Sequence, residues 1–315
     1  MNNRRSFIVG IKSIRLSNKE KIFLKKYKPW GVILFTRNIA SIKQTLNLTS
    51  SIRKIFNDKR YPILVDQEGG RVNRLKKIIS FDNLTSEFFG NKFTSNFMEF
   101  IFFYKLFIDK TSYLLKSAGI NINTSPVLDL RIKGTSNIIG DRSYSKDPKI
   151  VSKIGDYCIE YFHKNGIGTV IKHIPGHGLA KVDSHDFTPV VNKKKNFLSN
   201  KDFAAFKNKK CFFAMTAHII FGKIDSENTV THSKKMINII RNEVGFKNLL
   251  ISDDISMKSL KGSVKENTIR TFNSGCNLVL HCNGNFKEME IVGKNSPLIN
   301  KFILKKTSQF YKILS

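Results

Sequence analysis

The chain has 315 residues, of which 54 are basic and 24 acidic, giving a formal net charge of +30 at pH 7. Hydrophobic residues make up 41% of it, which is enough for a sizeable core and excludes wholesale disorder, because disordered chains combine high net charge with low hydrophobicity. The charge alone favours a protein that binds nucleic acid or a membrane surface, and the motifs have to be weighed against that hypothesis.

The N-terminal segment argues against export. The apolar stretch after Arg5 ends at Lys12, whereas a signal peptide needs an uninterrupted apolar run of roughly 7–15 residues. The most apolar window, residues 97–108, contains Glu99 and Lys105 and is much shorter than the ~20 residues that span a bilayer, so we expect a buried helix there. We therefore predict a cytoplasmic protein with no membrane contact.

Eight short apolar runs follow one another along the chain, at residues 7–10, 31–35, 62–65, 120–123, 169–171, 212–215, 249–251 and 277–280. Most are apolar on both faces, which is typical of parallel strands covered by helices. The segments between them carry helix signals. Ser41 and Gln44 form a capping-box pattern before an apolar stripe, and Asp147-Pro148 places a cap residue and a first-turn proline before another.

Eight strand-then-helix units in about 300 residues predict an α/β fold, a single (β/α)8 barrel of the TIM type, with a doubly wound open sheet as the alternative. Because the sequence has no repeat, low-complexity tract or Pro/Gly-rich linker, we expect one domain over residues 1–315. Reactive residues of such barrels lie just after the strands, at the C-terminal face. Polar residues occur at these positions after five of the runs: Asp66, Lys172, His173, His218, Asp253, Asp254 and His281.

The segment 172–185 is rich in histidine. His173 and His177 have the spacing of a zinc-binding helix, but Pro175-Gly176 between them disfavours a helix. The four cysteines form no CxxC pair either, so we predict no metal site. Asp183 and His185 are two residues apart, which lets a carboxylate orient an imidazole for general acid/base catalysis.

Two further segments carry candidate site residues. Asp253 stands at the tip of the seventh predicted strand, where a carboxylate can act as nucleophile or base, whereas Asp254 suits a helix cap. Residues 66–74 supply an acid, a glycine turn and two arginines, and Arg142 follows the fourth strand, although a single arginine in so basic a chain is most often a surface residue. Neither GxGxxG nor GxxxxGK[ST] occurs, so we expect no nucleotide cofactor and no other cofactor.

Taken together, these segments resemble the bacterial NagZ-type β-N-acetylhexosaminidases of glycoside hydrolase family 3. The resemblance spans about Gly31 to Gly284. Its motifs stand in the family's order, as DQEGGRVNR (66–74), IGDRS (139–143), KHIPGHG (172–178), DSH (183–185), MTAH (215–218), SDDISM (252–257) and GCNLVLHCNG (275–284).

The resemblance implies that Asp253 is the nucleophile, His185 the acid/base on a mobile loop, and Asp183 the partner that tunes it. It also implies that five residues contact N-acetylglucosamine: Asp66, Arg74, Arg142, Lys172 and His173. The implied activity is that of a retaining exo-β-N-acetylglucosaminidase that forms a covalent glycosyl-enzyme. Its implied substrate is a 1,6-anhydro-muropeptide, a small carbohydrate, in cytosolic peptidoglycan recycling.

Two alternatives stay open. The same residues would serve a phosphorylase in which phosphate replaces water. A basic nucleic-acid-binding protein on a barrel scaffold is the other, but the lysines are dispersed along most expected helices without an aromatic-interleaved basic stripe. We therefore expect no nucleic-acid partner and interpret the charge as a solvated coat, and the sequence makes no prediction of oligomeric state.

Overall fold

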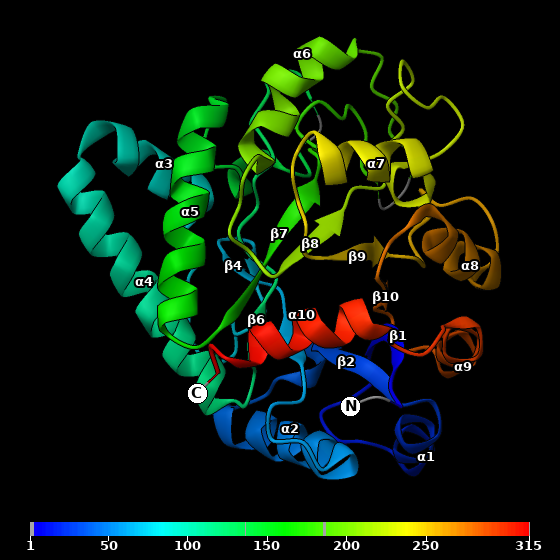
Figure 1. Cartoon of the computed structure of the whole chain (residues 1–315). Coiled ribbons are helices and arrows are strands. Elements are labelled where there is room, and N and C mark those ends of the chain that lie inside the picture. The colour runs from blue at the N-terminus through cyan, green and yellow to red at the C-terminus, as the bar shows by residue number, and fades with distance from the viewer. Residues whose placement is uncertain (1–2, 136, 185–186, 315) are drawn as a thin grey trace.

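A computed structural model of the chain describes residues 3–135, 137–184 and 187–314. Eight parallel strands close into a barrel in the order β1-β10-β9-β8-β7-β6-β3-β2 (Figure 1). These strands are β1 (Arg5–Gly10), β2 (Pro29–Leu34), β3 (Ile63–Val65), β6 (Ile122–Asn123), β7 (Gly168–Ile174), β8 (Phe213–Thr216), β9 (Leu249–Asp254) and β10 (Leu278–His281). Each overlaps one of the eight predicted runs, so the barrel is confirmed and the open sheet is excluded.

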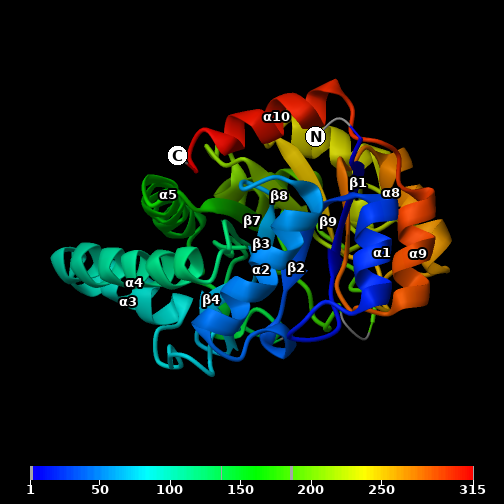
Figure 2. The same cartoon turned by 90° about the horizontal axis from the view of Figure 1, so that it is seen from below.

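Helices surround the barrel on its outside, with α3 and α4 on one side and α8 and α9 on the opposite side (Figure 2). The helices are α1 (Asn18–Tyr27), α2 (Ile42–Phe56), α3 (Ser86–Ser95), α4 (Phe97–Ser117), α5 (Pro148–Lys164), α6 (Lys195–Asn200), α7 (Lys234–Asn242), α8 (Val264–Ser274), α9 (Phe286–Asn295) and α10 (Lys301–Tyr311). After β3 the chain forms an antiparallel hairpin of β4 (Gln67–Gly69) and β5 (Val72–Asn73).

Helices begin after Ser41 and after Asp147, as predicted, but the hydrogen bonding at Ser41 differs from a regular capping box. The Ser41 hydroxyl accepts the amide of Gln44 at 3.2 Å and begins α2. The Gln44 side chain accepts the amide of Ala40 at 2.8 Å, so the reciprocal half of the capping box is displaced by one residue. Asp147 caps α5 by accepting the amide of Lys149 at 2.8 Å.

One end of the barrel is closed by α10. The Trp30 indole at the start of β2 donates to the Thr307 hydroxyl of α10 at 2.9 Å, and the rings of Phe213 and Phe310 lie 5.2 Å apart. These contacts lie at the N-terminal ends of the strands, where α10 crosses the barrel (Figure 1). The opposite end of the barrel, at the C-terminal ends of the strands, is where barrels of this type carry their active sites.

Residues 97–108 form a helix, as predicted, but the prediction that this helix is buried was wrong for one of its two faces. The segment is helical as part of α4, and Phe100 and Tyr104 are buried. Met98 is 75% exposed, however, and Phe102 and Leu106 are also exposed, because apolar residues occupy both faces and only one face packs against α3 and α5. Among the described residues, no helix is long and apolar enough to cross a membrane.

Candidate active site

Most of the predicted site residues gather around one cavity at the C-terminal ends of the strands. The cavity has a volume of about 180 Å³. Six of the eight predicted residues line it, namely Asp66, Arg74, Arg142, Lys172, His173 and Asp253. They come from segments at or after the ends of β3, β6, β7 and β9, which the closed barrel brings to one mouth.

Asp253 lies at the end of β9 with 20% of its side chain exposed. Its Oδ1 accepts the backbone amide of Asp254 at 2.8 Å, and its Oδ2 lies 3.9 Å from His173 Nε2. Burial acts to raise the pKa of Asp253, but the imidazoles of His173 and His218 outweigh it and hold the pKa below its ordinary value. The carboxylate is therefore ionised at neutral pH, as a nucleophile must be.

His173 is oriented by a buried carboxylate, Asp129. The His173 Nδ1–H donates to Asp129 Oδ2 at 2.7 Å, and Asp129 also accepts the backbone amide of His177 at 2.7 Å. Burial opposes ionisation, but the two histidines keep the pKa of Asp129 below its ordinary value. This arrangement fixes the tautomer of His173 and leaves its Nε2 facing Asp253. Sequence reasoning missed Asp129, because it follows none of the eight predicted strands directly and its importance lies in its contact with His173.

Five charged side chains of alternating sign, here called the charge chain, form the wall of the cavity. Arg74 pairs with Asp66 at 3.3 Å, Asp66 with Lys172 at 3.1 Å, Lys172 with Glu68 at 2.7 Å, and Glu68 with Arg142 at 2.8 Å. Only 3% of the Lys172 side chain is exposed. Such mutual pairing fixes the donors that remain free to meet sugar hydroxyls.

Glu68 is the member of the charge chain that sequence reasoning did not select. Burial acts to raise its pKa, but Arg142 and Lys172 reverse the effect and bring the pKa to about 2. Both Glu68 oxygens bind the Arg142 guanidinium, at 2.8 and 2.9 Å. Glu68 is part of the motif at residues 66–74, but its role depends on Arg142 and Lys172, which are distant from it in the sequence.

The other histidines at the mouth have structural partners. His218 is buried, with its Nδ1 accepting the Thr231 hydroxyl at 2.8 Å and its Nε2 donating to the Asp254 carbonyl at 3.0 Å. Burial lowers the pKa of His218, and it lowers that of His177 to about 4. His281 Nε2 lies 2.8 Å from Glu288. These rings support the strand ends and loops around Asp253.

The segment KHIPGHG continues β7 to Ile174 and then turns, so His173 and His177 do not share a helix. A Cβ on Gly178 would lie 2.5 Å from the Leu130 carbonyl oxygen, which shows how closely this loop packs against the segment that carries Asp129. Among the described residues, no group of three or more His, Cys, Asp or Glu side chains could hold a metal ion.

Of the predicted acid/base pair, Asp183 and His185, the structure describes only Asp183. Asp183 is half-buried in the loop after β7, and the next residue, Ser184, lines the cavity with its hydroxyl 3.2 Å from His177 Nε2. His185 lies outside the described residues. Its role, and the way Asp183 acts on it, stay predictions.

Comparison with known proteins gives consistent results. The glycosyl hydrolase family 3 N-terminal domain matches residues 7–303. A β-hexosaminidase of Nitrosomonas eutropha is 31% identical over 285 residues, covering 88% of this chain and 80% of the relative. A β-hexosaminidase of Haemophilus influenzae is also 31% identical, covering 88% and 79%. The crystal structure of NagZ from Neisseria gonorrhoeae with N-trifluoroacetyl-D-glucosamine superposes with a TM-score of 0.85 at 26% identity, over 98% of this chain and 90% of that one. The chain therefore belongs to glycosyl hydrolase family 3 and is a glycosidase.

Proposed function

We propose that this protein is a retaining exo-β-N-acetylglucosaminidase that removes a terminal N-acetylglucosamine from its substrate. The observation that carries the proposal is the ionised Asp253 carboxylate in a cavity of about 180 Å³ walled by the charge chain. The relatives named β-hexosaminidase, and the structural neighbour that holds an N-acylated glucosamine, support this choice of sugar.

In the proposed reaction, Asp253 attacks the anomeric carbon while protonated His185 gives its proton to the leaving oxygen, and the glycosidic C–O bond breaks. A glycosyl ester on Asp253 results. Neutral His185 then takes a proton from water, which displaces the Asp253 carboxylate and restores the β configuration. An imidazole, with a reference pKa of about 6.5, exists in both forms near neutral pH, and Asp183 holds it in position.

The remaining residues position the sugar. Since His173 Nδ1–H is committed to Asp129, the ring presents its Nε2 edge to a sugar hydroxyl beside Asp253. The N–H groups of Lys172, Arg142 and Arg74 donate to other hydroxyls, and Asp66 accepts from one. Because these groups are already held by ion pairs, little ordering remains to be done when the sugar binds.

We further propose that the natural substrate is N-acetylglucosamine linked to 1,6-anhydro-N-acetylmuramic acid, that the reaction belongs to cytoplasmic peptidoglycan recycling, and that residues 1–315 act as one catalytic unit. The resemblance to NagZ-type enzymes supports this part of the proposal, together with the match of the family domain to residues 7–303.

The direct test is turnover of 4-nitrophenyl N-acetyl-β-glucosaminide against the corresponding glucoside, with and without phosphate. We expect preference for the N-acetylated sugar and a rate that does not depend on phosphate. A phosphate-dependent rate would identify a phosphorylase instead.

Two variants assign the roles. Asp253→Ala should abolish turnover, with the exposed Asp82→Ala as control; near-normal activity of Asp253→Ala would contradict its assignment. His185→Ala should slow substrates with poor leaving groups far more than the 4-nitrophenyl substrate, because only the former need proton donation. Equal losses on both would argue against His185 as the acid.

A further inference from the structure

Helix α4 carries an apolar stripe on the face that points away from the barrel. Met98, Phe102 and Leu106 follow one another at four-residue steps, Tyr113 continues the line two turns later, and Phe103 lies beside it. These five residues are here called the α4 stripe. All five are exposed, whereas the opposite side of the helix is buried against α3 and α5. In both views α4 runs along the outer edge of the molecule (Figure 1, Figure 2), so a partner can reach the stripe.

The α4 stripe is large for an exposed apolar surface. Every other described helix exposes at most one large apolar side chain. A buried aromatic side chain covers about 150–250 Å², so the exposed fractions of the stripe leave roughly 600 Å² of apolar surface in water. This area is at the upper end of what a monomer exposes, and it equals the roughly 600 Å² that each partner contributes to the smallest stable interfaces. The stripe alone therefore supplies the area that a stable dimer needs.

The charges on α4 are nearly balanced. The helix contains Lys105, Lys110 and Lys116 against Glu99 and Asp109, so its net charge is +1, three minus two, in a chain of net charge +30. Asp109 also pairs with Lys105, one turn earlier. A helix that binds an anionic membrane surface is rich in lysine and arginine on its polar face. The nearly neutral α4 suits a partner that is itself apolar.

The charges are distributed unequally along the helix, which makes its surface complementary to itself. Glu99 stands in the first turn, whereas Lys110 and Lys116 stand in the C-terminal half. Two copies of α4 that pack antiparallel about a two-fold axis bring the acidic end of each copy to the basic end of the other, with the apolar stripes face to face. We propose that the chain forms a homodimer in which the α4 stripe of one copy covers that of the other.

Sedimentation velocity of the full chain tests the proposal without any substrate, so its outcome is independent of the proposed function. Interfaces of this size have dissociation constants of about micromolar or tighter, so at about 50 µM we expect a species of twice the chain's 36.1 kDa. Raising the salt from about 0.05 M to about 0.5 M should strengthen the dimer, because it screens the repulsion between two copies of net charge +30. A chain that stays monomeric under both conditions would overturn the proposal.

A charged stripe locates the interface. The double variant Phe102→Glu, Leu106→Glu should raise the dissociation constant at least roughly a hundredfold, because each copy would bury unpaired carboxylates. The control Ile22→Glu, Leu298→Glu makes the same change in charge away from α4, at side chains of matched exposure, 66% and 56% against 65% and 55%. The control should dimerise like the wild type. An equal loss in the control, or a stripe variant that dimerises normally, would overturn the proposal.

Near-UV circular dichroism verifies that each variant is folded. Should the double variant unfold, Met98→Glu takes its place with the same expected loss, because that side chain is 75% exposed and its replacement leaves the core intact. Co-sedimentation with vesicles of phosphatidylglycerol and phosphatidylcholine tests the other occupant. Binding of a monomeric wild type to these vesicles, lost in the stripe variant, would assign the stripe to a membrane surface and overturn the dimer.

Discussion

Asp202 is a buried carboxylic acid beneath the active-site loop, and its replacement by asparagine should change how stability depends on pH. The residue begins the 3-10 helix η3 (Asp202–Phe206) and is 1% exposed. Neither carboxylate oxygen has a well-formed hydrogen bond among the described residues, and the backbone amide of Leu179 offsets the effect of burial only weakly. Its Cβ lies 2.5 Å from the position that a Cβ on Gly176 would occupy, so it packs directly against the KHIPGHG loop.

The magnitude follows from the pKa of this group. Burial, and secondarily the negative charge of Asp129, raise the pKa of Asp202 from 3.8 to about 7. Between these two values the folded protein binds more protons than the unfolded chain, so stability falls as pH rises from about 4 to about 7. The full loss is about 4 kcal/mol, of which roughly 2.5 kcal/mol falls between pH 5 and pH 8.

Urea unfolding of wild type and Asp202→Asn at pH 5 and pH 8 measures this loss. Asparagine keeps the shape of the side chain and cannot ionise, and the desolvation cost of its amide is the same at both pH values. The variant should therefore lack the roughly 2.5 kcal/mol difference that Asp202 imposes between the two conditions. Asp82→Asn, at an exposed position, is the control and should retain it.

The reasoning fails if Asp202→Asn and wild type lose the same free energy of unfolding between pH 5 and pH 8. That outcome would mean that the folded protein solvates or pairs the Asp202 carboxylate.

Two further predictions concern the site. Glu68→Gln should lower the free energy of unfolding at pH 7 by about 3 kcal/mol, because Glu68, with a pKa of about 2 instead of 4.5, compensates Arg142 and Lys172. The deficit should shrink as pH falls from 4.5 toward 2, where Glu68 itself becomes protonated, and urea titrations that give a pH-independent deficit would contradict this. Gly178→Ala should cost about 1–3 kcal/mol of stability and reduce kcat/KM, because the new methyl group meets the Leu130 carbonyl and displaces the segment that holds His173. Unchanged unfolding midpoint and activity would show that the two loops do not depend on each other.

The barrel could be predicted from the sequence because its strands are short, apolar on both faces and bounded by polar residues. The same hydrophobic signal misled at α4, where Met98 and Phe102 are as apolar as the buried Phe100 but face away from the barrel. Hydrophobicity along the chain reports which segments are helical, whereas the face that packs depends on the neighbouring helices.

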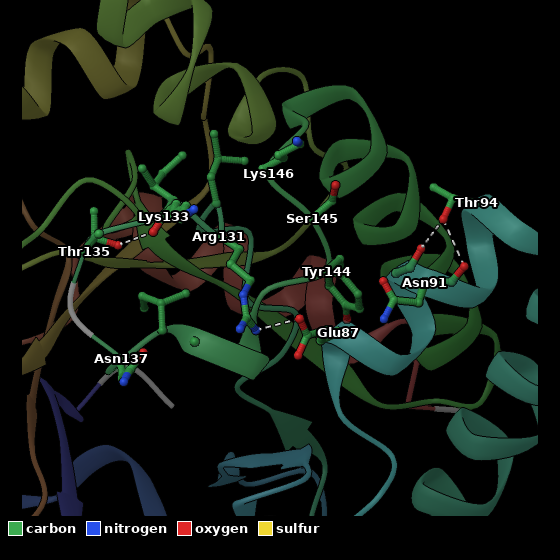
Figure 3. A pocket seen from close by; sticks show the side chains of 16 residues that line it. Glu87, Asn91, Thr94, Arg131, Lys133, Thr135, Asn137, Tyr144, Ser145 and Lys146 are labelled. Atoms are coloured by element: carbon green, nitrogen blue, oxygen red, sulfur yellow. Dashed lines mark hydrogen bonds and ion pairs between the residues drawn. The ribbon is translucent and has the colours of Figure 1, made fainter.

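For the site, position after a strand was sufficient to find Asp66, Lys172 and Asp253, since parallel strands bring their ends together. Glu68 and Asp129 were not found because their importance depends on pairing with Arg142 and His173, which no local pattern reveals. A second, wider cleft beside α3 was not predicted either (Figure 3). Besides α3, its lining comes from irregular segments between residues 130 and 146, which carry no periodic signal.

The central claim is that Asp253 forms a covalent bond with the sugar, and the most direct test is to trap that intermediate. A 5-fluoro N-acetyl-β-glucosaminyl fluoride has a good leaving group, while its ring fluorine slows both steps by destabilising an oxocarbenium-like transition state. Mass spectrometry of the digested protein should find one sugar attached to the peptide that contains Asp253. A sugar on a different residue, or an unlabelled protein that still hydrolyses the aryl substrate to the α-anomer, would contradict the account.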